Sequence, residues 1–176
     1  MSVVAGIIRD GKIHMAADSL ATSDDGDCRF RADKKIFKNK NYLIGFTGSP
    51  RAGQILMPRY WTPPTSIYDF PDSIREHYKD KGCMNCIEGT DAAGVNLLIG
   101  QKGCLYEILI DFQLAELVEP YSAIGTGKCH ALGSLYLSDK LGLIDRRKPY
   151  EILEYAIKAA EYFCSSVGGK VEYFKL

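Results

Sequence analysis

The order in which strand and helix patterns follow one another constrains the fold of this chain more than any other feature. Residues 3–8 are rich in β-branched side chains, Asp10-Gly11 marks a tight turn, and the extended pattern resumes over 12–18. After a polar stretch, residues 35–38 and 42–47 predict a second hairpin. The chain is therefore expected to open with strands before any helix begins.

Helices and further strands then follow in groups. Ser49 is placed to cap a helix that begins at Pro50, and Pro58 is expected to end that helix early. The later patterns predict helices over 71–81, up to 140 and over 149–166, and strands over 94–99, 104–110, 113–118, 121–124 and 171–174. Strand runs separated by helix pairs favour an α+β protein in which two antiparallel sheets carry helices on their outer faces.

Composition places the chain among ordinary globular proteins. Its 176 residues are 46% hydrophobic and 25% charged, which excludes a disordered tail or a fibre and predicts one domain over residues 1–176. The formal net charge is zero, so the overall charge gives no reason to expect a nucleic-acid partner. The longest apolar stretches fall far short of the roughly 20 residues that span a bilayer, and no secretory segment precedes the six cysteines. We expect a cytoplasmic protein with no membrane contact.

The serine at position 2 directly follows the initiator methionine and directly precedes an apolar strand. Methionine is normally removed ahead of a small residue, which would leave Ser2 with a free α-amine beside its own hydroxyl. An α-amine with an unperturbed pKa of about 7.7–8.0 can act as general base for that hydroxyl near neutral pH. Met-Ser is also a common start of a chain, so other residues have to decide whether Ser2 is a nucleophile.

Five segments together resemble the proteasome β-subunit and HslV family of N-terminal nucleophile hydrolases. They are Ser2-Val3-Val4-Ala5-Gly6, Ala16-Ala17-Asp18, Lys34-Lys35-Ile36-Phe37, Ile44-Gly45-Phe46-Thr47-Gly48 and Ile124-Gly125-Thr126-Gly127. They follow the order of that family and nearly its spacings over almost the full chain. The resemblance implies a four-layer αββα sandwich of two antiparallel sheets.

The resemblance also implies a role for each residue of a catalytic set. Ser2 would be the nucleophile, Lys35 the buried ammonium that lowers the pKa of the neighbouring hydroxyl and amine, and Asp18 its partner. Gly45 would donate its backbone N–H to the oxyanion, and the Thr126 hydroxyl would orient the amine. Without the family pattern, Asp18 and Lys35 read as surface residues, Gly45 as a plain strand glycine and Thr126 as a helix cap.

Two further sets of residues are carried over from the family. The substrate pocket, expected to take apolar or medium-sized side chains, would be lined by Ala21, Asp33, Phe37, Leu43 and Thr47. A structural monovalent or divalent cation would be bound by the backbone carbonyls of Glu161, Cys164 and Val167, although a plain helix end explains this stretch equally well. Residues 162–166 hold no carboxylate, which departs from the proteasome branch, and Cys164 favours the HslV-type branch.

The function that the resemblance implies is a serine-type peptidase subunit in a homo-oligomeric ring, acting on peptide or protein substrates without a required cofactor. Degradation of folded proteins would need an ATPase unfoldase that this chain does not contain. Two alternatives stay open: an N-terminal nucleophile amidase for small molecules, and an inert scaffold subunit that keeps Met1. Cys83 and Cys86, in a Cys-x-x-Cys spacing, are interpreted as loop thiols, a disulfide or half of a metal site.

Overall fold

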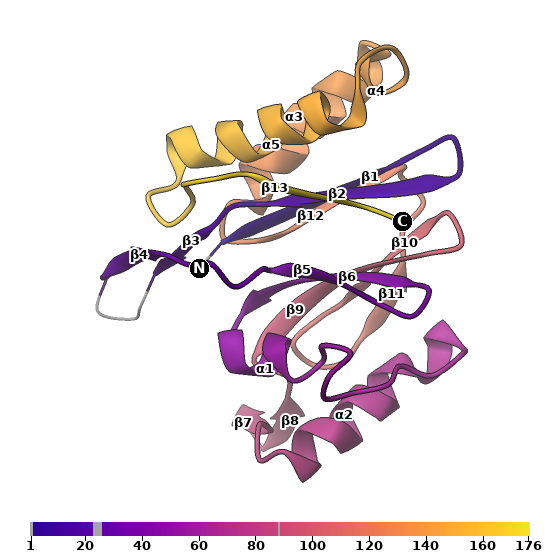
Figure 1. Cartoon of the computed structure of the whole chain (residues 1–176), viewed down its shortest axis with the longest axis vertical. Coiled ribbons are helices and arrows are strands. Elements are labelled where there is room, and N and C mark those ends of the chain that lie inside the picture. The colour runs from indigo at the N-terminus through magenta and orange to yellow at the C-terminus, as the bar shows by residue number, and fades with distance from the viewer. Residues whose placement is uncertain (1, 23–25, 88) are drawn as a thin grey trace.

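Two antiparallel sheets packed face to face form the centre of the molecule, and helices cover both outer sides (Figure 1). The computed structural model describes residues 2–22, 26–87 and 89–176. The first sheet has the strand order β12 (Tyr121–Gly125), β1 (Val3–Arg9), β2 (Lys12–Ala17) and β13 (Glu172–Lys175). The second sheet has the order β11 (Leu114–Glu116), β10 (Cys104–Ile108), β9 (Val95–Gln101), β6 (Tyr42–Gly48) and β5 (Ile36–Asn39).

Helices complete the outer layers. The first sheet is covered by α3 (Lys128–Lys140), α4 (Leu143–Arg146) and α5 (Pro149–Phe163), and the second by α1 (Pro50–Gln54), the 3₁₀ helix η1 (Ile67–Asp69) and α2 (Phe70–Asp80) (Figure 1). The expected four-layer αββα sandwich is therefore confirmed. Within the described ranges, no helix is both long and apolar enough to cross a bilayer.

Strand β1 explains why the chain opens on an almost continuous apolar run. Val3, Ala5 and Ile7 point toward α3 and α5, and Val4 points into the core between the two sheets. A strand that is buried on both faces needs apolar residues at every position rather than at alternate ones. Because β1 lies between β2 and β12, its first residues start inside the molecule.

Some elements lie outside the sequence predictions. A short hairpin joins β3 (Leu20–Thr22) to β4 (Cys28–Phe30), and a second joins β7 (Asn85–Ile87) to β8 (Thr90–Ala92). Both hairpins lie in polar stretches without an alternating apolar pattern, so periodicity could not reveal them. The polar loop expected over 22–31 is predicted to be least structured at residues 23–27, of which 23–25 lie outside the described residues.

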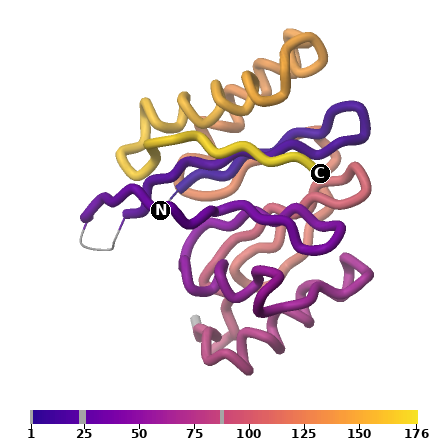
Figure 2. Tube along the Cα trace, viewed as in Figure 1, coloured from indigo at the N-terminus to yellow at the C-terminus, as the bar shows by residue number. Residues whose placement is uncertain are grey.

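The last part of the chain returns to the first sheet. The last strand, β13, pairs antiparallel with β2, so Glu172 lies opposite Ala17 and Lys175 opposite His14. Figure 2 shows this last segment running beside the opening hairpin. Residues from the start, the middle and the end of the chain therefore meet at the end of the sandwich where β1 begins.

Candidate active site

Ser2 lies at the boundary between two pockets at the end of the sandwich. Its exposed fraction is 6%. Pocket A, with a volume of about 60 Å³, is lined by Ser2, Ala21, Thr22, Arg31, Asp33, Lys35, Phe46, Thr47, Gly48 and Pro50. Pocket B, of about 300 Å³, is lined by Ser2, Thr47, Gly48, Gly94, Val95, Asn96, Ile110, Gly125 and Thr126. An extended ligand that crosses Ser2 would therefore find a pocket on either side.

Asp18 and Lys35 form an ion pair directly beside the start of β1. Lys35 Nζ lies 2.8 Å from Asp18 Oδ1 and donates a second hydrogen bond of 2.6 Å to the Leu20 carbonyl. The same Asp18 oxygen accepts the Val3 N–H at 3.0 Å, and Asp18 Oδ2 accepts the Gly168 N–H at 3.2 Å. The Asp18 carboxylate is thus fully engaged, and it ties β1 to the lysine and to the segment after α5.

Burial has the largest effect on the pKa of Lys35. Its side chain is only 12% exposed. Burial lowers the pKa of Lys35 below its ordinary value of 10.5, while the charge and the hydrogen bond of Asp18 act in the opposite direction. The structure therefore brings a partly desolvated ammonium into the pocket that holds Ser2.

A chain of hydroxyl groups reaches the backbone of Ser2 from the other side. Thr126 Oγ1 lies 3.2 Å from both Ser2 N and Ser2 O. It also lies 3.0 Å from Ser166 Oγ, which in turn lies 3.2 Å from Cys164 Sγ. The hydrogen bond from Ser166 lowers the pKa of the Cys164 thiol, although burial acts in the opposite direction. Sequence reasoning missed Ser166, because a serine just after a helix carries no signal until its neighbour Thr126 is known.

The structure places Gly45 away from the site and brings Gly48 to it. A Cβ atom on Gly45 would lie 2.6 Å from Val4 Cγ1, so this glycine allows the two sheets to pack closely. Phe46 N donates to the Lys35 carbonyl on the β5 side, and Ser49 N donates to Gly94 on the β9 side. Because N–H groups alternate along a strand, Gly45 N–H points to β9.

The same alternation directs Gly48 N–H toward the β5 side. Because β5 begins only at Ile36, which pairs with Gly45, Gly48 lies beyond the part of β6 that pairs with β5. Gly48 also has a φ of +110° and lines both pockets beside Ser2. The structure therefore contradicts the prediction for Gly45, and the glycine that it places beside Ser2 is Gly48, three residues later.

The five residues predicted for the substrate pocket divide into two groups. Ala21, Asp33 and Thr47 line pocket A. Phe37 instead packs against Phe46 in the core beneath α1 and α2, with ring centroids 6.4 Å apart, and Leu43 is fully buried between the sheets. The prediction is wrong for Phe37 and Leu43, because the β5–β6 register turns both side chains into the core.

The lining of pocket A is mixed rather than apolar. Arg31 and Asp33 form an ion pair of 2.6 Å there, and Asp33 also accepts a hydrogen bond of 3.0 Å from Gln54. Burial acts to raise the pKa of Asp33, but the hydrogen bond and charge of Arg31 outweigh it and the pKa is lowered. Thr47 Oγ1 is buried and has no hydrogen-bond partner within the described part of the chain. A ligand in either pocket could provide that partner.

The end of α5 brings Glu161, Cys164 and Val167 close together. The Cys164 carbonyl already accepts a hydrogen bond of 3.0 Å from Val167 N–H, which occupies one acceptor of the expected cation site. Among the residues described, no group of three or more His, Cys, Asp or Glu side chains could hold a metal ion. A cation here would therefore depend on backbone carbonyls, and its binding stays a prediction. Cys83 and Cys86 are free thiols.

No protein-family model matches the chain, and no curated protein sequence matches it. Several solved structures, in contrast, are similar to this chain. BPH from Thiobacillus denitrificans aligns with a TM-score of 0.83 at 21% identity, covering 99% of this chain and 97% of that one. The same protein in complex with epoxomicin gives a TM-score of 0.81 at 20% identity, with the same coverage. HslV from Trypanosoma brucei gives 0.74 at 16% identity, covering 99% of this chain and 98% of that one.

These similarities extend over nearly the whole of each chain, at identities that establish the fold and not the activity. The chain has the fold of the proteasome-type N-terminal nucleophile hydrolases. The resemblance drawn from five short sequence segments is confirmed at the level of the fold.

Proposed function

We propose that this chain is the subunit of a peptidase whose nucleophile is the hydroxyl of Ser2. One observation supports the proposal most strongly, namely the set of groups around Ser2. Ser2 lies between two pockets, and the Lys35–Asp18 ion pair lies on one side of it. On the other side, Thr126 Oγ1 accepts a hydrogen bond from the Ser2 nitrogen and is itself hydrogen-bonded to Ser166. A nucleophile, a positive charge and a polar group that orients the amine are the parts that acyl transfer at an N-terminal residue requires.

The proposed reaction begins after Met1, whose structure lies outside the described residues, has been removed. The α-amine of Ser2 takes the proton of its own hydroxyl, and Oγ attacks the carbonyl carbon of the substrate. Gly48 N–H stabilises the oxyanion. The amine then gives its proton to the leaving nitrogen, and water attacks the resulting ester with the amine again acting as base. Lys35 lowers the pKa of the amine and of the hydroxyl through its charge.

The two pockets support a peptide as the substrate. Pockets A and B flank Ser2 and share Thr47 and Gly48, so residues on both sides of a cleaved bond would have contacts. The Arg31–Asp33 pair favours polar or medium-sized side chains in pocket A. BPH binds epoxomicin, which makes that compound a suitable first probe of this site.

A ring assembly belongs to the same proposal. An exposed peptidase site would cleave other proteins at random, and a homo-oligomeric ring would limit access to chains that enter it. An ATPase unfoldase would then supply unfolded substrate. A cytoplasmic location agrees with the free thiol state of all six cysteines.

Intact mass measurement tests the nucleophile first. We expect the purified chain to lack Met1, and we expect incubation with epoxomicin to add one inhibitor mass to the wild type but none to Ser2→Ala. Hydrolysis of a fluorogenic peptide library should fall at least about 1,000-fold in Ser2→Ala, because the nucleophile and its base act as a unit. The Ser2→Thr variant keeps both functional groups and should retain activity.

Two results would contradict the proposal. Retention of Met1 with no labelling would leave the scaffold alternative. Labelling of Ser2 together with turnover of small amides but of no peptide in the library would leave the amidase alternative.

A further inference from the structure

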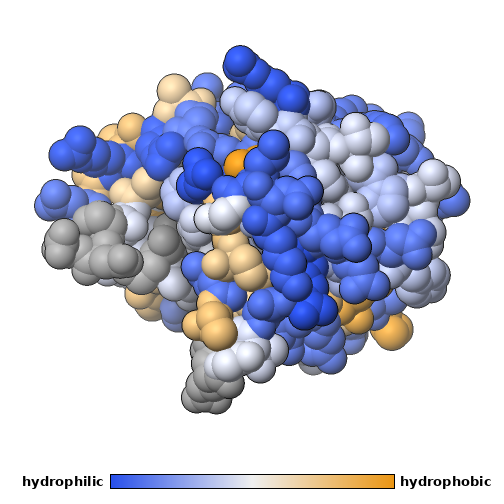
Figure 3. Space-filling model, turned by 90° about the horizontal axis from the view of Figure 1, so that it is seen from below, coloured by the Kyte–Doolittle hydropathy of each residue, from blue (hydrophilic) through white to orange (hydrophobic). Residues whose placement is uncertain are grey.

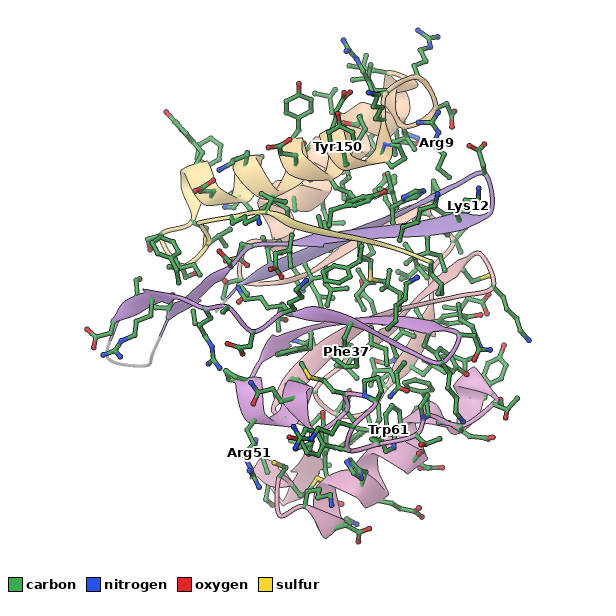
Figure 4. The ribbon with its side chains drawn as sticks, viewed as in Figure 1. Arg9, Lys12, Phe37, Arg51, Trp61 and Tyr150 are labelled. Atoms are coloured by element: carbon green, nitrogen blue, oxygen red, sulfur yellow. The ribbon has the colours of Figure 1, made fainter. Side chains whose placement is uncertain are left out.

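A strongly basic depression lies at the end of the molecule opposite to Ser2. This depression, here called pocket C, has a volume of about 300 Å³ between the β1–β2 turn, the link from α4 to α5, and β13. Its lining includes six cationic side chains, Arg9, Lys12, Arg146, Arg147, Lys148 and Lys175. Figure 4 shows Arg9 and Lys12 at this same end. Three segments that are remote in the sequence thus bring their positive charges to one place.

Little negative charge balances these groups. The one acidic residue on the lining, Asp10, lies 3.6 Å from Arg9, and its side chain is 85% exposed. The other five cations form no ion pair with any residue that the structure describes. Since the formal net charge of the whole chain is zero, this concentration is a local feature and does not follow from a basic composition.

One side-chain contact links two of the segments that line pocket C. The Arg9 guanidinium donates to the Arg147 carbonyl, which fixes the α4–α5 link against the β1–β2 hairpin. The 15-residue helix α5 begins at Pro149 beside pocket C, with no side-chain cap, so the positive end of its dipole adds to the field. Glu151 in its first turn accepts a hydrogen bond from Tyr150.

The pKa of His14 reflects the same positive charge. His14 lies on the lining, and its pKa is lowered by burial and then by the charges of Lys175, Arg9 and Lys12, with Asp10 acting weakly in the opposite direction. Like charges that are held close together repel unless an anion is bound between them.

We infer that pocket C binds an oligophosphate anion, either a free inorganic phosphate chain or the phosphate chain of a nucleotide. Charge balance favours this class, because one carboxylate offers a single charge to six cations, whereas a triphosphate offers about four on one short chain. Three of the six are arginines, whose planar guanidinium groups match phosphate oxygens in pairs. Tyr150, which is 44% exposed and follows Pro149, could stack on a base if the ligand is a nucleotide.

The inference does not depend on the proposed peptidase activity. Strand β1 begins next to Ser2 and ends at Arg9, and its seven residues span about 20 Å at roughly 3.3 Å per residue. A loss of binding at pocket C and a loss of peptide hydrolysis at Ser2 can therefore be observed separately.

Isothermal titration calorimetry of the full chain with sodium tripolyphosphate tests the inference. The pocket pair Lys12→Glu with Arg146→Glu should bind at least about tenfold more weakly than the wild type, because each lost contact is charge-assisted. The matched pair Lys38→Glu with Lys128→Glu makes the same charge change on exposed lysines elsewhere and should bind within about twofold of the wild type. Thermal unfolding without ligand checks that both pairs are folded, and Lys12→Gln with Arg146→Gln replaces the first pair if it is not.

Three results would overturn the inference: no binding by the wild type, equal weakening in the two pairs, or equally tight binding of a hexaglutamate peptide. A parallel titration with ATP separates the two sources of phosphate. Tighter binding of ATP that is lost in Tyr150→Ala assigns a nucleotide, and equal binding of ATP and tripolyphosphate assigns a free phosphate chain.

Discussion

Lys35 is the residue whose charge state has most effect on the proposed chemistry. It donates hydrogen bonds to Asp18 and to the Leu20 carbonyl, so it is held in one orientation beside Ser2. An ammonium in this position favours loss of a proton from nearby groups, because like charges disfavour the protonated amine. The activity should therefore depend on Lys35 staying protonated.

The pH dependence of peptide hydrolysis follows from this. The rate should rise with pH as the α-amine of Ser2 loses its proton, below its unperturbed pKa of about 7.7–8.0. It should fall again as Lys35 loses its proton, below the ordinary 10.5, because burial lowers the Lys35 pKa. A profile of kcat/KM between about pH 5 and 10.5 measures both limbs.

Two variants of Lys35 complete this test. Lys35→Arg keeps its charge over the whole measured pH range, so the alkaline limb should disappear from whatever activity remains. Lys35→Met should be inactive at every pH. An unchanged alkaline limb in Lys35→Arg would assign that limb to another group.

At the level of residues, the sequence predicted which side chains meet around Ser2 better than it predicted the backbone geometry. Ser2, Asp18, Lys35 and Thr126 could be predicted because each stands in a short segment that resembles the family. The choice between Gly45 and Gly48 could not, because it depends on which N–H groups of β6 are paired with β5 and β9. Which N–H groups face which neighbour is set by the register of β6 against β5 and β9, and β9 is remote from β6 in the sequence.

Two helical glycines show how packing overrides intrinsic helix preference. Gly53 in α1 lies against the Phe46 ring, and an added Cβ would approach a ring carbon to 2.2 Å. Gly133 in α3 is exposed and has nothing within 4 Å of such a Cβ. By helix propensity alone, alanine would be favourable at both positions.

We expect opposite effects of alanine at these two sites. Gly133→Ala should stabilise the protein by about 0.5–1 kcal/mol, raising Tm by roughly 1–4 °C for a chain of this size. Gly53→Ala should destabilise it by about 1–3 kcal/mol, because the Phe46 ring must leave a packed core. Thermal unfolding of both variants measures this, and a stabilised Gly53→Ala would show that α1 moves freely over the second sheet.

At the level of elements, the longer strands and helices could be predicted and the short ones could not. Helix α5 buries Ile152, Ala156 and Ala160 at helical spacing, and β1 is an apolar run, so both elements can be predicted from the hydrophobic pattern. The hairpins β3–β4 and β7–β8 have three-residue strands with polar or exposed positions, so contacts elsewhere in the fold specify them.

At the level of the whole molecule, the two outer layers differ in character. The view from below, onto the side of α2, is mostly hydrophilic (Figure 3). The helices of the opposite layer carry large apolar side chains that are more than half exposed, namely Tyr136, Leu137, Tyr155, Tyr162 and Phe163. Exposed apolar groups of this size commonly mark contacts between subunits.

Sedimentation should therefore show an assembly of several 19.6 kDa chains. Tyr155→Glu combined with Phe163→Glu should shift the protein toward smaller species, because a buried unpaired charge is unfavourable at an interface. Tyr68→Glu, at a residue that is 70% exposed on the opposite layer, is the matched control and should leave the mass unchanged. A monomeric wild type would contradict the ring.

The contacts of Ser2 and Asp18 have a consequence for the timing of synthesis. Thr126, Ser166 and Gly168 complete the surroundings of residues that leave the ribosome more than a hundred positions earlier. A nascent chain therefore exposes Ser2 before the contacts of Asp18 with Gly168 and of Thr126 with Ser2 can form. The proposed nucleophile is therefore among the first residues to be made and among the last whose surroundings are complete, so the proposed cleavage could begin only after the chain has folded.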